Sequence, residues 1–502
     1  MSNKPSSEDD MNISSRKAPE KLAKESHELG ITVKKSEDLS EWYTQVLQKA
    51  ELIEYTDISG CYILRPMLYA MWEKATGWFD AELKKMNVQN SYFPLFIPKH
   101  LLTKEASHVE GFKAEVAWVT HGGDTKLQEP LAVRPTSETI MYDAFSKWIR
   151  SHRDLPLKIN QWCNIVRWEF KHPTPLLRTR EFLWHEAHTA HATHEEAACM
   201  VRDAIQLYSK LFTELYALPI MTGRKSENEK FAGAEYTESV ETFLPNGRGC
   251  QVSTAHHLGQ HFSKAFNITF LDENSKTQHV FQTSWGFSTR SLGILIMMHG
   301  DDKGLVLPPT MAPVQIAIVP IYKDSDKQAI LAKAAGVQKE LQTEYRVTLD
   351  DREYSPGWKF NHWELKGACI RLELGPKDLE KQQVVLVRRD SGKKTFVQIK
   401  ELKKTIAQEL ETMQKDMLAK AQHQFNQSLA EVKNWTEFTK AIGAKKLVSA
   451  AWCATTACEA AIKEKTEGVK SLTIPFEQPK KFGTCVQCGK PATCVAYFGK
   501  SY

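Results

Sequence analysis

The stretch "VRWEFKHPTPLLRTREFLWHE", residues 166–186, sets charged and aromatic side chains on both sides of a loop that contains two prolines. It predicts two antiparallel strands joined by that loop, because aromatic residues favour strands and proline favours turns. Alternate residues of a strand share a face, so Arg167, Arg178 and Phe182 are expected over one surface. Guanidinium groups bind phosphates and an aromatic ring stacks on a base, which together suit a nucleotide. Spacing alone equally allows a surface hairpin with Arg–Glu ion pairs.

The chain has 502 residues, with a hydrophobic fraction of 42% and a charged fraction of 25%. This length predicts two to four domains and large cores, and the composition is that of an ordinary globular protein. The sequence has no long apolar run of membrane-spanning type and no signal-like start, so a cytoplasmic protein without a membrane span is expected. The net charge of +5 is too small to indicate nucleic-acid binding by itself.

Composition and periodicity divide the chain into four parts. Residues 1–30 are polar and aperiodic, and predict a mobile charged tail. Residues 31–310 mix strand-like and helix-like segments without a βαβ rhythm, which favours an α+β domain with an antiparallel sheet. Three prolines in residues 305–313 mark a boundary, and residues 311–400 then predict a small α/β domain. The remaining segment, 401–502, opens with a helix whose packing stripe is Leu402, Ile406, Leu410, Met413 and Met417.

Cysteines gather at the C-terminal end of the sequence. Cys453-x4-Cys458 and Cys485-x2-Cys488 supply two pairs of thiolates, a set suited to tetrahedral zinc. Four protein ligands leave no open position, so the zinc would be structural and residues 401–502 would form a small zinc-binding α/β domain. The extra Cys494 leaves the identity of the fourth ligand open.

The segment "HEAHTAHATH" is a weaker metal candidate. Its histidines are not spaced as H-E-x-x-H, and on a strand His185 and His188 face opposite ways. Thr193 and Glu196 instead predict a capping box that opens a helix. We therefore expect no metal in this segment, and His188 is a candidate for the wall of a binding pocket. The sequence also contains neither a P-loop nor a G-x-G-x-x-G nucleotide motif.

Several segments in order resemble one family. "RWEF…RTREF" resembles motif 2 of the class II aminoacyl-tRNA synthetases, and "RPTSE" (134–138) resembles the prolyl-tRNA synthetases in particular, of the eukaryotic and archaeal type. The other similar segments are "YFPLFIP" around Pro94 for motif 1, "KFAGAEYT", "AHHLGQHF", "SWGFSTRSLG" (284–293) for motif 3, and "SPGWKFNHWELKG" for the anticodon-binding domain. The resemblance extends from about residue 35 to Tyr502 and includes the cysteine cluster as a C-terminal zinc domain.

The resemblance implies a proline–tRNA ligase. Such an enzyme joins L-proline to ATP as prolyl-adenylate, with Mg²⁺ on the phosphates, and transfers the prolyl group to tRNA(Pro). Motif 1 implies a homodimer, and the short interval between motifs 2 and 3 implies that no editing domain is inserted there. Two alternatives remain open: a class II synthetase-like protein that binds tRNA without activity, and a class II enzyme for another amino acid.

The resemblance also implies residue roles. The catalytic arginines are Arg167 and Arg290. The proline site is formed by Thr136, Glu138, Arg167, Trp184, Phe231 and His256. The ATP site is formed by Arg167, Glu169, Arg178, Thr179, Phe182, Gln251, Thr254, Ser288 and Arg290. Anticodon contacts are expected from Arg352, Lys359, Glu364 and Lys366. The zinc ligands are Cys453, Cys458, Cys485 and Cys488.

Some positions have a second interpretation. Glu138 follows Thr-Ser and precedes an apolar run, so it also suits a helix cap. Val252 and Ser253 stand where the family usually has glycine-like residues, which puts the shape of the pocket near Gln251 in question. The terminal Tyr502 resembles a family residue whose carboxylate folds toward the active site. Arg180 has no implied role beyond an ion pair with a neighbouring glutamate.

Overall fold

The structure is a computed structural model that describes residues 30–102, 115–169 and 172–502. The predicted mobile tail, residues 1–30, lies outside these residues except for Gly30. Among the described residues, no helix combines the length and the apolar character that crossing a membrane requires.

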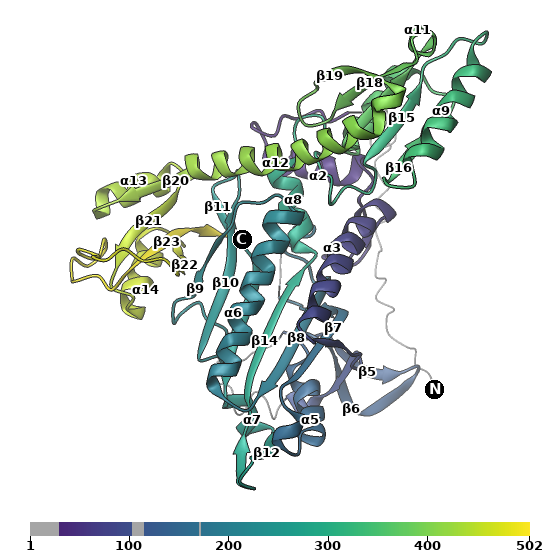
Figure 1. Cartoon of the computed structure of the whole chain (residues 1–502). Helices are drawn as coiled ribbons and strands as arrows, with labels where there is room; N and C mark the ends of the chain where they lie inside the picture. Colours follow the sequence, from purple (N-terminus) through teal and green to yellow (C-terminus); the bar gives the residue numbers. More distant parts are fainter. Residues whose placement is uncertain (1–29, 103–114, 170–171) are drawn as a thin grey trace, which may run out of the picture.

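One eleven-stranded sheet organises the molecule (Figure 1). In spatial order its strands are β20 (Leu429–Val432), β21 (Leu447–Trp452), β23 (Cys494–Ser501), β22 (Lys470–Pro475), β9 (Met221–Arg224), β10 (Tyr236–Phe243), β11 (Arg248–Gly259), β14 (Phe281–Ser288), β8 (Glu181–His191), β7 (Leu157–Val166) and β3 (Gln89–Asn90). From β9 to β7 every neighbouring pair is antiparallel, which confirms the predicted antiparallel sheet.

Helices cover this central sheet. They are α2 (Leu39–Lys49), α3 (Pro66–Lys85), α5 (Glu138–Trp148), α6 (His194–Lys210), α7 (His261–Ala265) and α8 (Arg290–His299), with the short helices η1 (His152–Asp154) and η2 (Leu211–Leu215). The capping box predicted from Thr193 and Glu196 is present at the start of α6. Large aromatic side chains such as Phe79, Phe212 and Trp285 fill the space between helices and sheet, so the sheet face opposite them is left to form a site.

Smaller sheets extend the edges of this domain. The hairpin of β1 (Ile53–Tyr55) and β2 (Tyr62–Leu64) follows α2. A three-stranded sheet combines β4 (Phe96–Pro98), β6 (Thr125–Val133) and β5 (Trp118–Gly122), and a second hairpin pairs β12 (Thr269–Leu271) with β13 (Thr277–His279).

The second domain is an α/β unit, as its sequence predicts. Its sheet has the order β16 (Val347–Leu349), β15 (Ile316–Pro320), β17 (Ile370–Leu374), β18 (Gln383–Arg388) and β19 (Lys394–Gln398). Its helices are α9 (Lys327–Leu341), α10 (Pro356–Leu365) and α11 (Pro376–Glu380). Every residue of β15 and β17 is buried, as expected for apolar strands covered on both faces.

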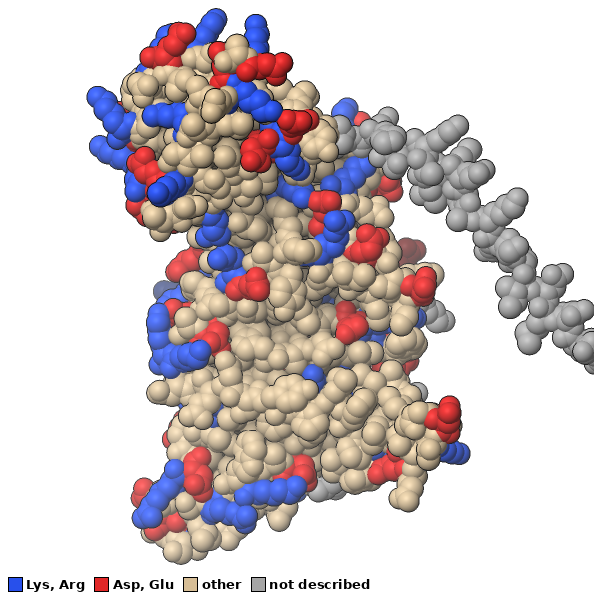
Figure 2. Space-filling view, turned by 90° about the vertical axis from the view of Figure 1, so that its right-hand side faces the viewer, with Lys and Arg blue, Asp and Glu red and all other residues tan. Residues whose placement is uncertain are grey.

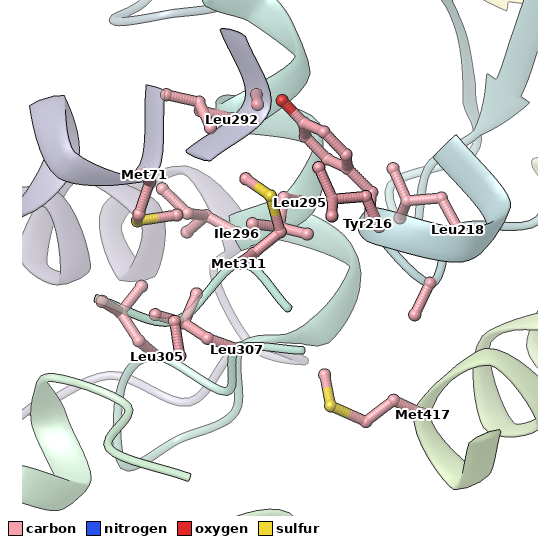
Figure 3. Close-up of a cluster of buried hydrophobic side chains, with 14 of the residues drawn as sticks. Met71, Tyr216, Leu218, Leu292, Leu295, Ile296, Leu305, Leu307, Met311 and Met417 are labelled. Carbon is pink, nitrogen blue, oxygen red and sulfur yellow. The ribbon is translucent and has the colours of Figure 1, made fainter. Parts of the chain in front are cut away.

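A long helix, α12 (Leu402–Ser428), follows η3 (Ile399–Glu401) and runs from the second domain to the C-terminal unit (Figure 1). All five residues of the predicted stripe are buried. Met417 belongs to a core cluster that also contains Leu295 of α8 and Met311 of the connecting segment (Figure 3). The C-terminal unit adds α13 (Trp435–Gly443) and α14 (Thr456–Lys465) to strands β20–β23, which continue the central sheet. The three parts therefore share packed interfaces.

Candidate active site

A cavity of about 300 Å³ opens on the central sheet and gathers most of the predicted site residues. The predicted residues that line it are Thr136, Glu138, Arg167, Phe182, Trp184, Phe231, Gln251, Thr254, His256, Ser288 and Arg290. His188, expected as a candidate for the pocket wall, also lines the cavity. Lining residues without a predicted role are Glu186, Glu229, Thr237, Val252, Ser253, Ser284, Trp285, Gly286 and Phe287. The alternation expected for β8 is confirmed, because residues 182, 184, 186 and 188 all line the cavity.

Two arginines bring positive charge to the cavity. Arg167 Nε donates to the carbonyl of Pro135 at 3.0 Å, and its guanidinium lies 5.7 Å from the ring of Phe182 and 5.5 Å from that of Trp184. Arg290 Nε donates to the carbonyl of Leu177 at 2.9 Å. Burial lowers the pKa of Arg167, neighbouring carboxylates raise it, and the charge of Arg290 lowers it again. An anion bound between the two guanidinium groups would relieve that repulsion.

Two carboxylates, those of Glu138 and Glu186, bring negative charge to the cavity. Glu138 is the first residue of α5 and accepts a hydrogen bond from the hydroxyl of Thr136, so it combines a helix-start position with a place in the cavity. Glu186 accepts from the backbone N–H and the hydroxyl of Ser137 and contacts His188 Nε2 at 3.3 Å. Burial opposes ionisation of Glu186, yet the hydrogen bonds from His188 and Ser137 hold its pKa below the ordinary value. The cavity therefore contains fixed negative charge beside its arginines.

The apolar wall is made by aromatic rings. The ring centroids of Phe231 and His256 lie 4.7 Å apart, and His256 Nδ1 lies 2.9 Å from the Thr237 hydroxyl. Burial, with smaller electrostatic contributions from His188 and Arg167, lowers the pKa of His256 to about 3. His256 is thus a neutral ring at physiological pH. A Cβ at Gly286 would lie 2.7 Å from a backbone oxygen of β8, so only glycine permits this strand contact.

Three predicted ATP-site residues do not line the cavity: Glu169, Arg178 and Thr179. The loop closes in a tight turn, where Arg178 N–H donates to the Thr174 carbonyl at 2.9 Å and Leu176 has φ +63°. Strand β8 consequently begins at Glu181, and the prediction that the strand extends back through Arg178 is wrong. Arg178 and Glu169 are exposed, whereas Thr179 is buried in the loop.

Arg180, for which sequence gave no role, connects this loop to the β1–β2 hairpin. Its N–H donates to the Gly60 carbonyl at 2.9 Å and its Nη1 donates to the Ser59 carbonyl at 3.0 Å. Its own carbonyl accepts from the N–H of Arg167 at 2.7 Å, and its guanidinium lies 4.5 Å from the ring of Trp168. Arg180 therefore fixes the backbone that carries Arg167.

Strand β11 carries two residues beside Gln251 that line the cavity, and Tyr502 packs against the same strand. Val252 and Ser253 line the cavity, as the departure from glycine-like residues implied, and the buried Ser253 hydroxyl has no hydrogen-bond partner. Tyr502 N–H donates to the Gly249 carbonyl at 3.2 Å, and the Tyr502 hydroxyl accepts from Asn246 Nδ2 at 2.7 Å. The terminal residue therefore lies against the strand that supplies Gln251.

A groove of about 670 Å³ lies beside α10 in the second domain, and Arg352 and Lys366 line it. The rings of Tyr354, Trp358 and His362 form a continuous stack, with centroids 3.9 Å and 5.0 Å apart. Such an aromatic surface with basic neighbours suits unstacked bases.

The other two predicted anticodon residues face elsewhere. Lys359 is buried and its Nζ donates to the Asp350 carbonyl at 2.9 Å. Glu364 pairs with Arg371 at 2.9 Å and lines a different cavity. Helical spacing explains this, because Trp358 and His362 share one face of α10, whereas Lys359 follows Trp358 by one position and Glu364 follows His362 by two, so both turn away from that face.

The predicted zinc ligands form one cluster. The sulfur atoms of Cys453, Cys458, Cys485 and Cys488 all lie within 4.8 Å of one another, with Cys458–Cys485 at 3.5 Å and Cys453–Cys488 at 3.8 Å. A tetrahedron with Zn–S bonds of about 2.3 Å has edges of about 3.8 Å, so these thiols fit zinc. Cys494 lies outside the cluster and contacts the Trp452 carbonyl at 3.7 Å. Its burial raises the pKa of its thiol to about 11.

The histidines of residues 185–194 do not form a metal site together. His185 contacts Asn160 Oδ1 at 2.8 Å and the Tyr208 hydroxyl at 2.7 Å on the helix side of the sheet. His188 lines the cavity on the other side, as strand alternation predicts. Among the residues that the structure describes, no group of potential ligands contains two of the four histidines.

Comparisons with known proteins agree with this geometry. Residues 114–299 match the family "tRNA synthetase class II core domain (G, H, P, S and T)", residues 315–409 match "Anticodon binding domain", and residues 435–502 match "Prolyl-tRNA synthetase, C-terminal". The chain is 51% identical to the cytoplasmic proline–tRNA ligase of Arabidopsis thaliana over 484 residues, which covers 94% of this chain and 91% of that protein. It is 49% identical to the proline–tRNA ligase of Lachnoclostridium phytofermentans, covering 93% and 97% of the two chains.

A solved structure is equally similar. The prolyl-tRNA synthetase of Cryptosporidium parvum, complexed with halofuginone and AMPPNP, superposes with a TM-score of 0.90 at 49% identity, covering 94% of this chain and all of that one. The fold and the cavity thus define a class II aminoacyl-tRNA synthetase with an anticodon-binding domain, which confirms the predicted fold class. Within that class, the chain belongs to the prolyl-tRNA synthetase family, and it is a proline–tRNA ligase.

Proposed function

We propose that the chain activates L-proline with ATP, forms prolyl-adenylate, and transfers the prolyl group to tRNA(Pro). The single observation that carries this proposal is the meeting of Arg167, Arg290 and Glu138 in one cavity. The two arginine side chains can bind the phosphates of ATP and the carboxylate of proline, and the carboxylate of Glu138 can bind the proline ammonium group.

In the first step, a carboxylate oxygen of proline attacks the α-phosphorus of ATP and pyrophosphate leaves. Negative charge builds between the carboxylate and the α-phosphate, where Arg167 is the bridging donor. Arg290 and Phe182 enclose the adenine from opposite faces, and Gln251, Thr254 and Ser288 line the rest of the nucleotide. Mg²⁺ arrives as part of the ATP substrate and neutralises its phosphates. No protein nucleophile is needed, so positioning and electrostatic stabilisation carry the catalysis.

Recognition of proline rests on charge and shape. Glu138, oriented by Thr136, faces the secondary ammonium of proline. Phe231, Trp184 and the neutral ring of His256 form the wall against the pyrrolidine ring. We infer that the neutral state of His256 matters, because a cation there would repel the ammonium of the substrate.

In the second step, a ribose hydroxyl of the terminal adenosine of tRNA attacks the prolyl carbonyl and AMP leaves. We propose that anticodon bases stack in the groove on Trp358 and His362, with Arg352 and Lys366 at their edges. Lys359 and Glu364 then act indirectly, since their contacts hold α10 in place. Glu169, Arg178 and Thr179 reach ATP only if the loop moves when the nucleotide binds.

The four clustered cysteines hold a structural Zn²⁺ in this proposal. All four ligands come from the protein, so the ion ties the segment after β21 to the loop before β23 without a free coordination position. The division into residues 31–310, 311–400 and 401–502 follows as a proposal for the functional units. The word "cytoplasmic" in the name of the Arabidopsis relative supports the same location for this chain.

A homodimer is also proposed. The segment around motif 1 exposes Tyr92 and Phe96, and Trp118 of β5 and Trp148 of α5 are also exposed. Figure 2 shows the face of the molecule on the side of α3 and β5–β6, and the middle of that face carries few charged residues. An exposed apolar surface of this kind is typical of an interface between subunits.

Editing in cis is not expected between motifs 2 and 3. Residues 187–283 form α6, β9–β13 and the end of β8, all of which belong to the synthetase core or its edge. A proline-shaped pocket rejects an amino acid of similar size only weakly, because one methylene is worth about 1–3 kcal/mol. Cysteine and alanine should therefore be activated measurably.

ATP–pyrophosphate exchange with each of the twenty amino acids tests the proposal. We expect strong exchange with proline and weak exchange with cysteine and alanine. Exchange with no amino acid would support the alternative of a tRNA-binding protein without activity. Strong exchange with an amino acid other than proline would support a different specificity. Exchange with cysteine at the background level would contradict the weak selectivity of the pocket.

A further inference from the structure

A second set of potential metal ligands lies outside the cysteine cluster. His194 begins α6, Glu235 precedes β10, and His257 lies on β11. Glu235 Oε2 lies 3.1 Å from His194 Nε2 and 3.3 Å from His257 Nδ1. A tetrahedral site with bonds of about 2.0–2.1 Å has edges of about 3.3 Å. Two of the three separations match such an edge, and all three ligand atoms lie within 4.8 Å of one another, so we call these residues the His194 triad.

The hydrogen bonds around His257 orient it as a ligand. Its Nε2 lies 3.3 Å from the carbonyl of His194, which fixes Nε2 as the donor nitrogen. The N–H of Gly259 donates to Nδ1 at 3.2 Å, so Nδ1 carries the lone pair. The unprotonated Nδ1 and the Glu235 carboxylate repel each other at 3.3 Å, and a cation between them would stabilise this contact by taking the Nδ1 lone pair in place of the Gly259 hydrogen bond. Metal-bound histidines commonly donate their second nitrogen to a backbone carbonyl in this way.

Glycine at position 259 lets the carboxylate approach. Gly259 has φ +57°, and a Cβ there would lie 2.1 Å from Glu235 Oε1. The rings of His194 and His257 pack with centroids 4.3 Å apart, and one nitrogen of each lies near the Glu235 carboxylate. The side chain of His257 is fully buried, whereas those of His194 and Glu235 are 44% and 36% exposed. An ion can therefore enter from solvent without unfolding the chain.

We propose that the His194 triad binds a divalent transition-metal ion of the zinc type, with solvent at the remaining position. Two imidazole nitrogens and one carboxylate oxygen are a common ligand set for Zn²⁺ and Co²⁺. The site is separate from the catalytic cavity, because His256 lines the cavity and the next residue, His257, points to the other face of β11. The ion ties the start of α6 to β10 and β11, and so stiffens the strands behind the proline pocket.

Titration with Co²⁺ of the full-length protein prepared with one Zn²⁺ per chain, enough to fill only the cysteine cluster, tests the proposal. With the cysteine cluster already filled, we expect one Co²⁺ per chain with weak visible absorption and no intense thiolate-to-cobalt band. The intense band would reveal exchange into the cysteine cluster instead. Binding should also raise the melting temperature, since an ion that binds only the folded chain stabilises it.

Variants identify the ligands. His194→Ala should weaken Co²⁺ binding at least about 100-fold, and Glu235→Gln, which keeps the side-chain volume, should weaken it similarly. His261→Ala is the matched control, because this exposed histidine of α7 contacts the Gly233 carbonyl at 2.9 Å and lies outside the His194 triad. The proposal is overturned if the wild-type protein binds no Co²⁺ at millimolar concentration, or if both triad variants bind it as tightly as the wild type. Both results are independent of ligase activity.

Discussion

At the scale of single residues, Arg167, which the sequence resemblance places at the reacting phosphate, is held in position by its neighbours. Arg167 is held by the Pro135 carbonyl and enclosed by the rings of Phe182 and Trp184. Because the guanidinium is fixed before substrate binds, we expect it to stabilise the transition state without reorganising.

Arg167→Ala should therefore remove one preorganised donor. We expect kcat for ATP–pyrophosphate exchange to fall about 10²–10³-fold, equivalent to about 3–4 kcal/mol. Arg153→Ala serves as the control, since Arg153 is exposed in η1 and outside the cavity, and it should retain wild-type exchange. A loss below about fivefold in the Arg167 variant would contradict the bridging role.

The site residues differ in how well sequence predicts them. Strand alternation placed Phe182, Trp184 and His188 on one face, and it also implied Glu186, to which no role was given. Arg178 also lies an even number of residues before Phe182, so alternation predicts it on the same face. The turn at Leu176 instead leaves Arg178 in the loop before β8. Glu229 and Thr237 reach the cavity from a separate segment, and no local pattern signals that approach.

At the scale of elements, the β1–β2 hairpin supports the segment between β7 and β8, which contains Arg167. Its turn contributes the Ser59 and Gly60 carbonyls to Arg180, whose own carbonyl holds the N–H of Arg167. Gly60 has φ +85°, and a Cβ there would lie 2.9 Å from Arg180 Cγ. No periodicity in the sequence links residue 60 to residue 180, so this contact only becomes visible in the fold.

Gly60→Ala should displace the loop through Arg180. We expect kcat for proline activation to fall about tenfold or more, because small displacements of catalytic groups are costly. Gly468→Ala is the matched control: Gly468 also has a positive φ, +108°, but nothing lies within 4 Å of its Cβ position. Both variants should lose similar stability from backbone strain, so thermal melting separates that effect from catalysis. Equal kcat in the two variants would contradict the link.

The cluster of Cys453, Cys458, Cys485 and Cys488 is the element that sequence predicted most completely, because paired cysteine spacing indicates thiols that can converge on one ion. Cys485→Ser should release the zinc and lower the melting temperature, whereas Cys494→Ser should retain one zinc per chain at that cluster. Both side chains are buried, so general disruption of the core affects them alike. The metal content of the purified variants, measured by atomic emission with the His194 triad variant His194→Ala as background, decides between them. Zinc loss in Cys494→Ser alone would reverse the ligand assignment.

At the scale of the whole molecule, the modules form one packed body. The cluster around Met417, Leu295 and Met311 joins α12 to α8 and to the segment between domains (Figure 3). Strand β23 also pairs with β11. Sequence predicted the stripe of α12 from its spacing. It could not reveal that the C-terminal strands would extend the catalytic sheet, because such pairing depends on contacts between distant segments.

A packed body that buries neutral histidines should lose stability in mild acid. Burial lowers the pKa of His191 to about 3 and lowers that of His185 well below its ordinary value of about 6.5. The unfolded chain therefore binds more protons than the folded chain once the pH falls below about 6.5. Stability is present above that pH and is lost as the pH falls toward 3. Each of these two buried groups contributes up to about 1.4 kcal/mol per pH unit.

Thermal unfolding between pH 7 and pH 5 measures this effect. We expect the melting temperature to fall with pH, and to fall less steeply in His191→Gln, which removes one titrating ring beside Thr189. The exposed His423 provides the control, since His423→Gln should leave the slope unchanged. Release of metal in acid affects all three proteins alike, so the difference between their slopes isolates His191. An identical slope in wild type and His191→Gln would show that His191 takes up no proton on unfolding, contrary to its burial as a neutral ring.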